Sequence, residues 1–157
     1  MMSIQPGTHY TIQNKATKNV ITQTPKFRRG SGLCGWSGMP PATLNPGNAA
    51  MSYWHFTEHS LDHYQISNVF NDGWRMFGWS DGYVDVFNGT RAPDQVWQVE
   101  RTNDGEYFKV FNPTIKRTLY DGNAVGQTGA LGTADEAYLF DQDRFLWAIL
   151  AVSHTAA

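Results

Sequence analysis

The chain has 157 residues and a mass of 17.7 kDa, a size that fits one domain over residues 1–157. Its 12 lysines and arginines face 14 aspartates and glutamates, so the formal charge of -2 gives no electrostatic basis for a nucleic-acid partner. No apolar run approaches the roughly 18 residues that span a bilayer, and the N-terminal segment lacks the basic and apolar regions of a signal peptide. We therefore expect no membrane insertion and a cytoplasmic location.

Composition and turn signals favour an all-β fold. Aromatic residues make up 14% of the chain and charged residues only 17%, and the 15 glycines are spread along it rather than pooled in linkers. Aspartate or asparagine before glycine favours a tight turn, because glycine accepts a positive φ without steric cost. Such pairs occur at Asp72-Gly73, Asp81-Gly82, Asn88-Gly89, Asp104-Gly105 and Asp121-Gly122. Short alternating runs such as Tyr83–Val86 lie between them, as expected for half-buried strands.

An opening motif recurs along the chain. Tyr10–Asn14 (Tyr-Thr-Ile-Gln-Asn) returns as Tyr64–Asn68 and, more loosely, as Phe108–Asn112. Each copy is followed by a tryptophan in an apolar segment, and these are Trp54, Trp97 and Trp147. The pattern predicts three repeats, at about residues 7–58, 62–102 and 104–152.

Three repeats of this length predict the architecture. Three propeller blades would be fewer than the usual minimum of about four, whereas three four-stranded units close a barrel with a hairpin cap. The expected fold is therefore a β-trefoil. Packing around its axis requires equivalent residues from each repeat, so we expect Ile12, Ile66 and Val110 to point inward and the three closing tryptophans to lie in the core.

The first repeat contains a basic segment bounded by proline and glycine, Thr24–Gly32. Its Lys26, Arg28 and Arg29 are 3 of the 12 lysines and arginines of the chain. Trypsin-like proteases select such side chains through an acidic pocket, and an inhibitor presents one on a rigid, extended loop. We expect a loop here, with a serine protease as the partner or with no partner at all. The glycines favour the second interpretation, because a mobile loop is cleaved rather than held.

The end of the first repeat carries His55–His59, which matches the zinc-binding pattern His-x-x-Glu-His. That motif requires a helix, whereas here it spans the end of a closing strand and the following turn, so we expect no metal site. Elsewhere Cys34 lacks a neighbouring acid–base signature, and the sequence contains no Gly-x-Ser-x-Gly elbow or phosphate loop. We expect no enzyme activity and no cofactor.

The opening Pro6–Asn14 and the Gln-x-Trp at Gln95–Trp97 resemble the fungal β-trefoil lectins of the ricin-B type. The second repeat is more similar to a mushroom branch that holds both glycan-binding lectins and the trypsin inhibitors called mycospins. The segments that carry this likeness are Gly78–Gly82, Val84–Phe87 and Asp94–Trp97. The resemblance implies a β-trefoil with a glycan groove in the second repeat. For a mycospin-like inhibitor it implies that Arg28 or Arg29 is the primary contact.

The same resemblance implies the residues of the groove. By position they are Trp79, Phe87, Asp94 and Gln95. Their chemistry suits a sugar, whose C–H face packs on a flat aromatic ring and whose hydroxyls need fixed donors and acceptors. Trp74, beside a predicted turn, either extends the groove or covers the mouth of the barrel.

Two functions remain open. The first is a non-enzymatic lectin whose partners are glycans or glycoproteins, with a homodimer as a way to gain avidity. The alternative is an inhibitor of trypsin-like serine proteases that acts through the basic segment of the first repeat.

Overall fold

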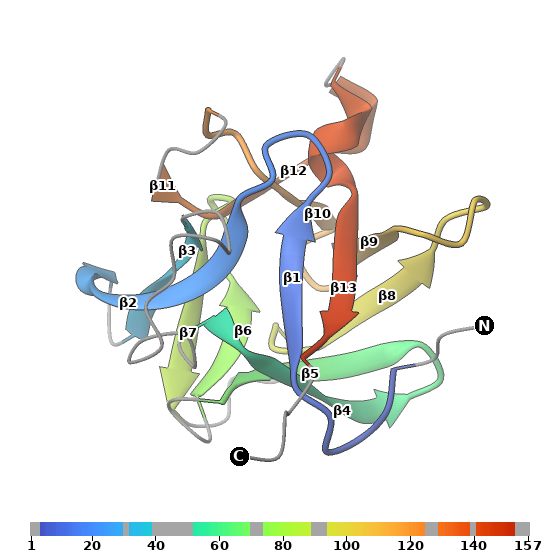
Figure 1. The fold of residues 1–157 in the computed structure, drawn as a ribbon. Coiled ribbons are helices and arrows are strands. Elements are labelled where there is room, and N and C mark those ends of the chain that lie inside the picture. The colour runs from blue at the N-terminus through green and yellow to red at the C-terminus, as the bar shows by residue number, and fades with distance from the viewer. Residues whose placement is uncertain are drawn as a thin grey trace.

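The computed structural model describes residues 4–29, 32–38, 52–69, 74–88, 94–124, 129–138 and 141–152, mostly as β-strands (Figure 1). The strands are β1 (Tyr10–Asn14), β2 (Val20–Arg29), β3 (Gly32–Gly38), β4 (Trp54–Ser60), β5 (His63–Asn68), β6 (Trp74–Gly78), β7 (Val84–Asn88), β8 (Trp97–Arg101), β9 (Phe108–Asn112), β10 (Arg117–Tyr120), β11 (Gly129–Ala130), β12 (Gly132–Ala134) and β13 (Trp147–Ala151). Two short 3-10 helices, η3 (Glu136–Tyr138) and η4 (Gln142–Phe145), precede β13. Within these residues no helix has the length and apolar character to cross a membrane.

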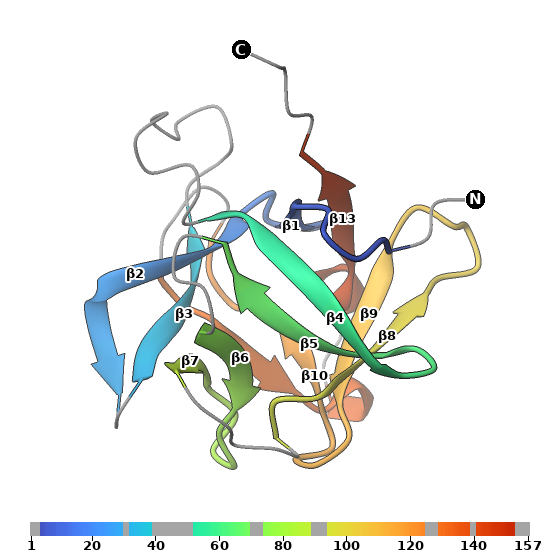
Figure 2. The ribbon, with the colours of Figure 1, turned by 90° about the horizontal axis from the view of Figure 1, so that it is seen from below.

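Six of the strands close into a barrel. Going around it, β1, β4, β5, β8, β9 and β13 each pair antiparallel with the next, and β13 pairs with β1 to complete the circle. The hairpins β2–β3, β6–β7 and β10–β12 lie between the two barrel strands of each repeat. Figure 2 shows this arrangement from below. Two barrel strands and one hairpin from each of three repeats make a β-trefoil, as predicted.

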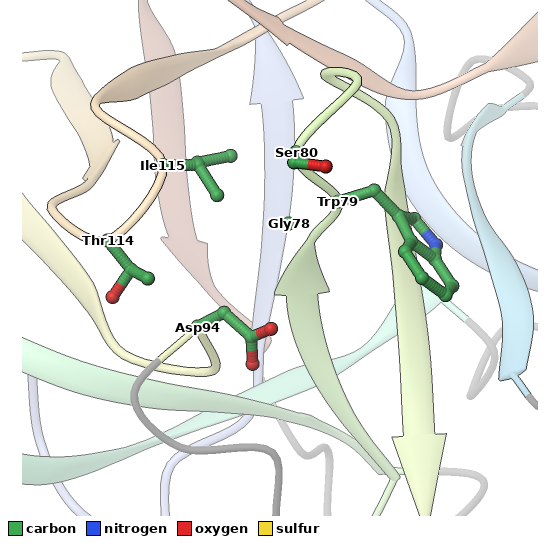
Figure 3. Close-up of a pocket in the computed structure, with 6 residues that line it drawn as sticks. All are labelled: Gly78, Trp79, Ser80, Asp94, Thr114 and Ile115. Atoms are coloured by element: carbon green, nitrogen blue, oxygen red, sulfur yellow. The ribbon is translucent and has the colours of Figure 1, made fainter.

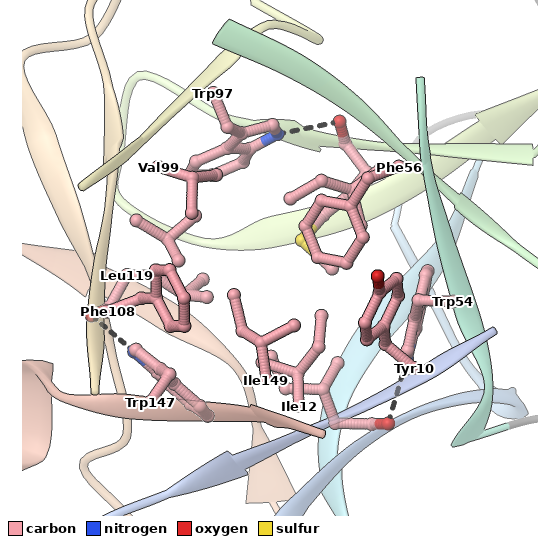
Figure 4. Packing of buried hydrophobic residues seen from close by; sticks show 14 of the residues in the cluster. Tyr10, Ile12, Trp54, Phe56, Trp97, Val99, Phe108, Leu119, Trp147 and Ile149 are labelled. Carbon is pink, nitrogen blue, oxygen red and sulfur yellow. Dashed lines mark hydrogen bonds between the residues drawn. The ribbon is translucent and has the colours of Figure 1, made fainter. Parts of the chain in front are cut away.

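The three closing tryptophans hold equivalent places in the core (Figure 4). Trp54, Trp97 and Trp147 are all fully buried. Each indole Nε1 donates a hydrogen bond to a backbone carbonyl on the second strand of its own repeat, and the acceptors are Ile21 (3.0 Å), Met76 (3.0 Å) and Leu119 (3.1 Å). These bonds satisfy the one polar group that each buried indole carries. Ile12, Ile66 and Val110 are also fully buried, as expected for the inward face of the barrel.

The basic segment of the first repeat differs from the expected loop. Strand β2 continues to Arg29, where Arg28 pairs with Leu33 and Arg29 with Gly32 of β3. The prediction of a loop was wrong because β3 supplies an antiparallel partner beyond the proline, after a register shift between Gln23 and Arg28. Figure 2 shows this hairpin extending away from the barrel.

The His-x-x-Glu-His segment lies on strand β4 and not on a helix. His55 is half-buried, whereas Glu58 and His59 are exposed near the end of the strand. Among the described residues, no group of three or more His, Cys, Asp or Glu side chains is placed to hold a metal ion.

Candidate functional site

A pocket of about 570 Å³ opens where the second repeat meets the third (Figure 3). Gly78 is the last residue of β6, Trp79 and Ser80 follow it in the turn toward β7, and Asp94 comes from the segment before β8. Thr114 and Ile115 come from the turn that joins β9 to β10. We call this space the junction pocket.

Backbone and amide bonds hold the three segments of the junction pocket together. The carbonyl of Asp94 accepts hydrogen bonds from the Gly78 amide (3.3 Å) and from Nδ2 of Asn112 (3.0 Å). The other side-chain atom of Asn112, Oδ1, accepts the amides of Thr114 (3.0 Å) and Ile115 (3.2 Å). One buried asparagine thus closes the turn and fastens it to the residue that supplies the carboxylate.

Gly78 makes room for the apolar wall. A Cβ atom at this position would lie 2.5 Å from Cδ1 of Ile115, well inside van der Waals contact. Ile115 therefore keeps its place beside the pocket because residue 78 has no side chain.

The equivalent junction between the third and first repeats is filled. Asp121 is the equivalent of Gly78. The Asp121 amide donates a hydrogen bond to the carbonyl of Arg144 (3.2 Å), just as the Gly78 amide donates to the carbonyl of Asp94. The carboxylate of Asp121 is fully buried and accepts hydrogen bonds from Thr17 Oγ1 (2.5 Å) and Asn19 Nδ2 (3.1 Å). The two junctions therefore share a backbone arrangement. Glycine at position 78 leaves an open pocket, whereas the aspartate at position 121 fills the same space with a hydrogen-bonded side chain.

Trp79 belongs to an aromatic cluster at the edge of the junction pocket. Its indole is half-buried, lies 5.1 Å from the ring of Phe77 and donates from Nε1 to the buried carboxylate of Asp85. Phe87 packs edge-on against the same Phe77 ring, with the two centroids 6.2 Å apart. Figure 3 shows the Trp79 ring pointing away from Asp94. The ring therefore forms a ledge next to the pocket and does not stand opposite the carboxylate.

The structure brings together some of the predicted site residues and separates others. Trp79 and Asp94 both line the junction pocket. Phe87 contacts Phe77 in the aromatic cluster and is not among the described residues that line the pocket. The half-buried Trp74 packs against the hydrophobic core. Lys26, Arg28 and Arg29 are on the separate β2–β3 hairpin.

Gln95 is fully buried, so the structure does not present it to a ligand. The reason is its place two residues before the closing tryptophan. In the other repeats this position packs inside the cap: Ser52 donates to the Thr22 hydroxyl at 2.9 Å, and Phe145 lies 4.9 Å from the ring of Tyr120. We therefore do not include Gln95 among the residues of the candidate site.

Sequence reasoning missed the wall that the third repeat supplies. Thr114 and Ile115 lie about 20 residues beyond Asp94 in the chain, and the antiparallel pairing of β8 with β9 brings the two segments to the same end of one hairpin. The sequence signal that indicates this turn is Asn112. An asparagine at the end of the opening motif accepts amides of the following turn in both the first and the third repeat.

The chemistry of the junction pocket is that of a small polar ligand with an apolar side. Asp94 is the one charged group among its described lining residues, and Ser80 and Thr114 add hydroxyls that both donate and accept. Ile115 provides an apolar surface beside them. This set suits hydroxyl groups that donate to a carboxylate while C–H groups pack against a hydrocarbon wall.

Comparison with known proteins supports the fold. No protein-family model and no curated protein matches the sequence. Among solved structures, a mosquitocidal holotoxin matches 97% of this chain with a TM-score of 0.76 at 19% identity, and the chain spans 18% of that protein's length. The BEL β-trefoil matches 96% of this chain and 97% of its own (TM-score 0.68, 15% identity). A Polyporus squamosus lectin matches 94% of this chain and 50% of its own (TM-score 0.67, 17% identity).

Proposed function

We propose that this β-trefoil is a non-enzymatic lectin that binds glycans in the junction pocket. The observation that carries the proposal is the pairing of the Asp94 carboxylate and two hydroxyls with the apolar wall of Ile115 in one open space. The fold likeness adds support, because the Polyporus squamosus lectin was solved with the glycan Neu5Aca2-6Galb1-4GlcNAc bound.

In this proposal one sugar unit enters the junction pocket. Two of its hydroxyls donate to Asp94, and Ser80 and Thr114 bond further hydroxyls at the rim. The C–H face of the ring packs on Ile115. The half-buried Trp79 gives the next unit of the glycan an aromatic surface, and its bond to Asp85 holds that surface in one orientation.

A blocking substitution tests the site. Thr114→Lys places a long side chain across the exposed rim of the junction pocket, so affinity should fall by about tenfold or more, which corresponds to about 1.4 kcal/mol. The matched control is Ala16→Lys, which occupies the same turn position in the first repeat, next to the filled junction. Calorimetry with hits from a glycan array provides the measurement. Equal affinity in both variants would place the glycan site elsewhere.

Two further variants, measured in the same assay, distinguish the contribution of the Asp94 carboxylate from that of the Trp79 ring. Asp94→Ala removes the acceptor for hydroxyls and should change the order of preference among sugars. Trp79→Ala removes the ledge and should weaken longer glycans more than single sugars, because the ring lies beside the pocket.

The β2–β3 hairpin gives a second candidate function, inhibition of a trypsin-like serine protease. The observation that favours it is the backbone pairing at Arg28 and Arg29, because a paired strand loses less entropy on binding than a free loop. A variant with both arginines replaced by alanine should lose trypsin inhibition and keep glycan binding. Rapid cleavage after either arginine, without lasting inhibition, would exclude this function.

A further inference from the structure

We propose that the chain has a second saccharide-binding pocket, at the opposite end of strand β9 from the junction pocket. This pocket has a volume of about 410 Å³, within the range of small-ligand sites. Its walls come from the β8–β9 hairpin and the two 3-10 helices, and its lining includes Glu100, Arg101, Asn103, Lys109, Glu136 and Gln142. We call it the hairpin pocket. Among the described residues the two pockets share no lining residue, so the inference goes beyond the proposed function.

One wall of the hairpin pocket is a fixed ion-pair network. Lys109 Nζ lies 2.6 Å from Oε1 of Glu136, and the hydroxyl of Thr118 donates to Oε2 of the same carboxylate at 2.8 Å. Gln142 Nε2 donates to the backbone carbonyl of Glu136 at 3.1 Å. Both oxygens of Glu136 are therefore engaged, and the network holds η3 and η4 against β9 and β10.

The second wall presents a guanidinium group in a defined position. Cζ of Arg101 lies over the ring of Phe108, 5.3 Å from its centroid, and no carboxylate of the described residues pairs with the guanidinium. Its Nη1 lies beside the turn, 3.9 Å from where a Cβ of Gly105 would be. A guanidinium that contacts an aromatic ring in this way is partly positioned by it and keeps N–H groups available for a ligand.

The turn that carries Asn103 is also well ordered by hydrogen bonds. Asp104 Oδ1 accepts the Thr102 hydroxyl and the Glu106 amide, and the bond from Thr102 is the main reason that the pKa of Asp104 is lowered. The Gly105 amide closes the turn on the carbonyl of Thr102 at 2.9 Å. The exposed Asn103 side chain, with a donor and an acceptor, is thus carried on a fixed backbone.

The balance of charges points to a neutral ligand rich in hydroxyls. Arg101 and Lys109 face two carboxylates, Glu136 in the ion pair and Glu100 directly across the strand pair from Lys109, so the lining has no net charge. Donors and acceptors nevertheless remain on every side, and Leu146 adds an apolar surface. A saccharide meets both conditions, whereas a simple anion would meet Glu100 and Glu136 along with the two cations.

The two pockets are able to work at the same time. The junction pocket uses the turn after β9, and the hairpin pocket uses the hairpin before it, which projects from the barrel in Figure 1. A five-residue strand separates them, so ligands in the two pockets do not collide. One chain would then hold two glycans and gain avidity without a partner copy.

The test is an NMR titration of the isotope-labelled full chain with galactose, mannose, N-acetylglucosamine and N-acetylgalactosamine, one at a time. We expect at least one of them to shift the amides of Arg101, Asn103 and Gln142, and sodium acetate at equal concentration to leave them in place. If none of the four sugars shifts these amides, or if acetate shifts them equally, the proposal is wrong.

Two variants locate the binding. Arg101→Met keeps a stem over Phe108 and removes the guanidinium, so affinity at the hairpin pocket should fall by about tenfold. Asn103→Ala changes an exposed turn side chain whose amide is placed to bond a hydroxyl of the ligand, so affinity should fall by about threefold. Thr57→Ala, on the exposed face of β4, is the control. Unchanged affinity in a folded Arg101→Met or Asn103→Ala variant would overturn the assignment.

The two proposals fail separately. Thr114→Lys should remove the shifts around the junction pocket and leave those around Arg101 unchanged. Shifts around Arg101 alone would disprove the proposed function and keep the hairpin pocket, whereas shifts around Asp94 alone would do the reverse.

Discussion

Gly78 is the residue on which the opening of the junction pocket depends. Its amide makes the same backbone contact that Asp121 makes in the third repeat, so the two positions differ only in what projects from them. At Asp121 a carboxylate fills the space and binds Thr17 and Asn19. At Gly78 the space is left to Ile115 and to solvent, and a ligand is able to enter.

Gly78→Ala should destabilise the protein through its contact with Ile115. The added Cβ would lie 2.5 Å from Cδ1 at the movable end of that side chain, so the cost should be near the low end of the range for overpacking, about 1 kcal/mol. Because Ile115→Ala removes the atoms that the new Cβ would meet, the two substitutions together should cost less than the sum of their separate losses. Urea denaturation of the two single variants and the double variant measures the coupling. Additive effects would show that the two residues do not meet.

At the scale of elements, the turns after β1 and after β9 are built in the same way. In each, an asparagine at the end of the strand accepts two amides of the turn and donates to the carbonyl three residues before a closing tryptophan. That carbonyl belongs to Arg144 in one case and to Asp94 in the other. In these two repeats the asparagine of the opening motif therefore joins the repeat to the end of the preceding repeat around the barrel.

The hairpins between the barrel strands differ more than the turns. β2–β3 continues to Arg29 with a register shift, whereas β6–β7 runs in register from Trp74 to Gly78 and then turns at Gly82, where φ is +100°. Contacts with the barrel constrain the positions of the first and last residues of each hairpin. The length and register of the hairpin beyond these residues differ between repeats. Candidate functions accordingly lie on the hairpins and turns.

At the scale of the whole molecule, the fold was predictable and the candidate site only in part. The recurrence of Tyr10–Asn14 and of the closing tryptophans reflects packing around one axis, and packing leaves a periodic trace in the sequence. The direction in which a side chain of the cap points has no periodic signal in the sequence. Gln95 and Asp94 were therefore both predicted to bind a ligand, whereas Gln95 is buried and Asp94 lines a pocket. Ile115 could not be assigned because its neighbours come from another repeat.

Trp97→Ala should lower the free energy of unfolding by about 3 to 5 kcal/mol, the usual cost of truncating a buried aromatic residue. The variant leaves a large cavity in the core and removes the donor that satisfies the Met76 carbonyl. Chemical denaturation gives the value, with Trp79→Ala as a partly buried comparison that should cost less. A loss near zero for Trp97→Ala would mean that the threefold tryptophan layer does not hold the barrel together.

The pairing of β1 with β13 also determines how the molecule responds to a mechanical load. Tyr10 lies opposite Ala151 and Asn14 opposite Trp147, so the outer ends of both strands are at the same end of the ladder. Tension between Tyr10 and Ala151 acts along the interstrand hydrogen bonds, which are perpendicular to antiparallel strands, and loads them one pair at a time. The barrel therefore opens under such tension as a zipper, at low force, whereas tension between Tyr10 and Trp147 shears all the pairs of the ladder together.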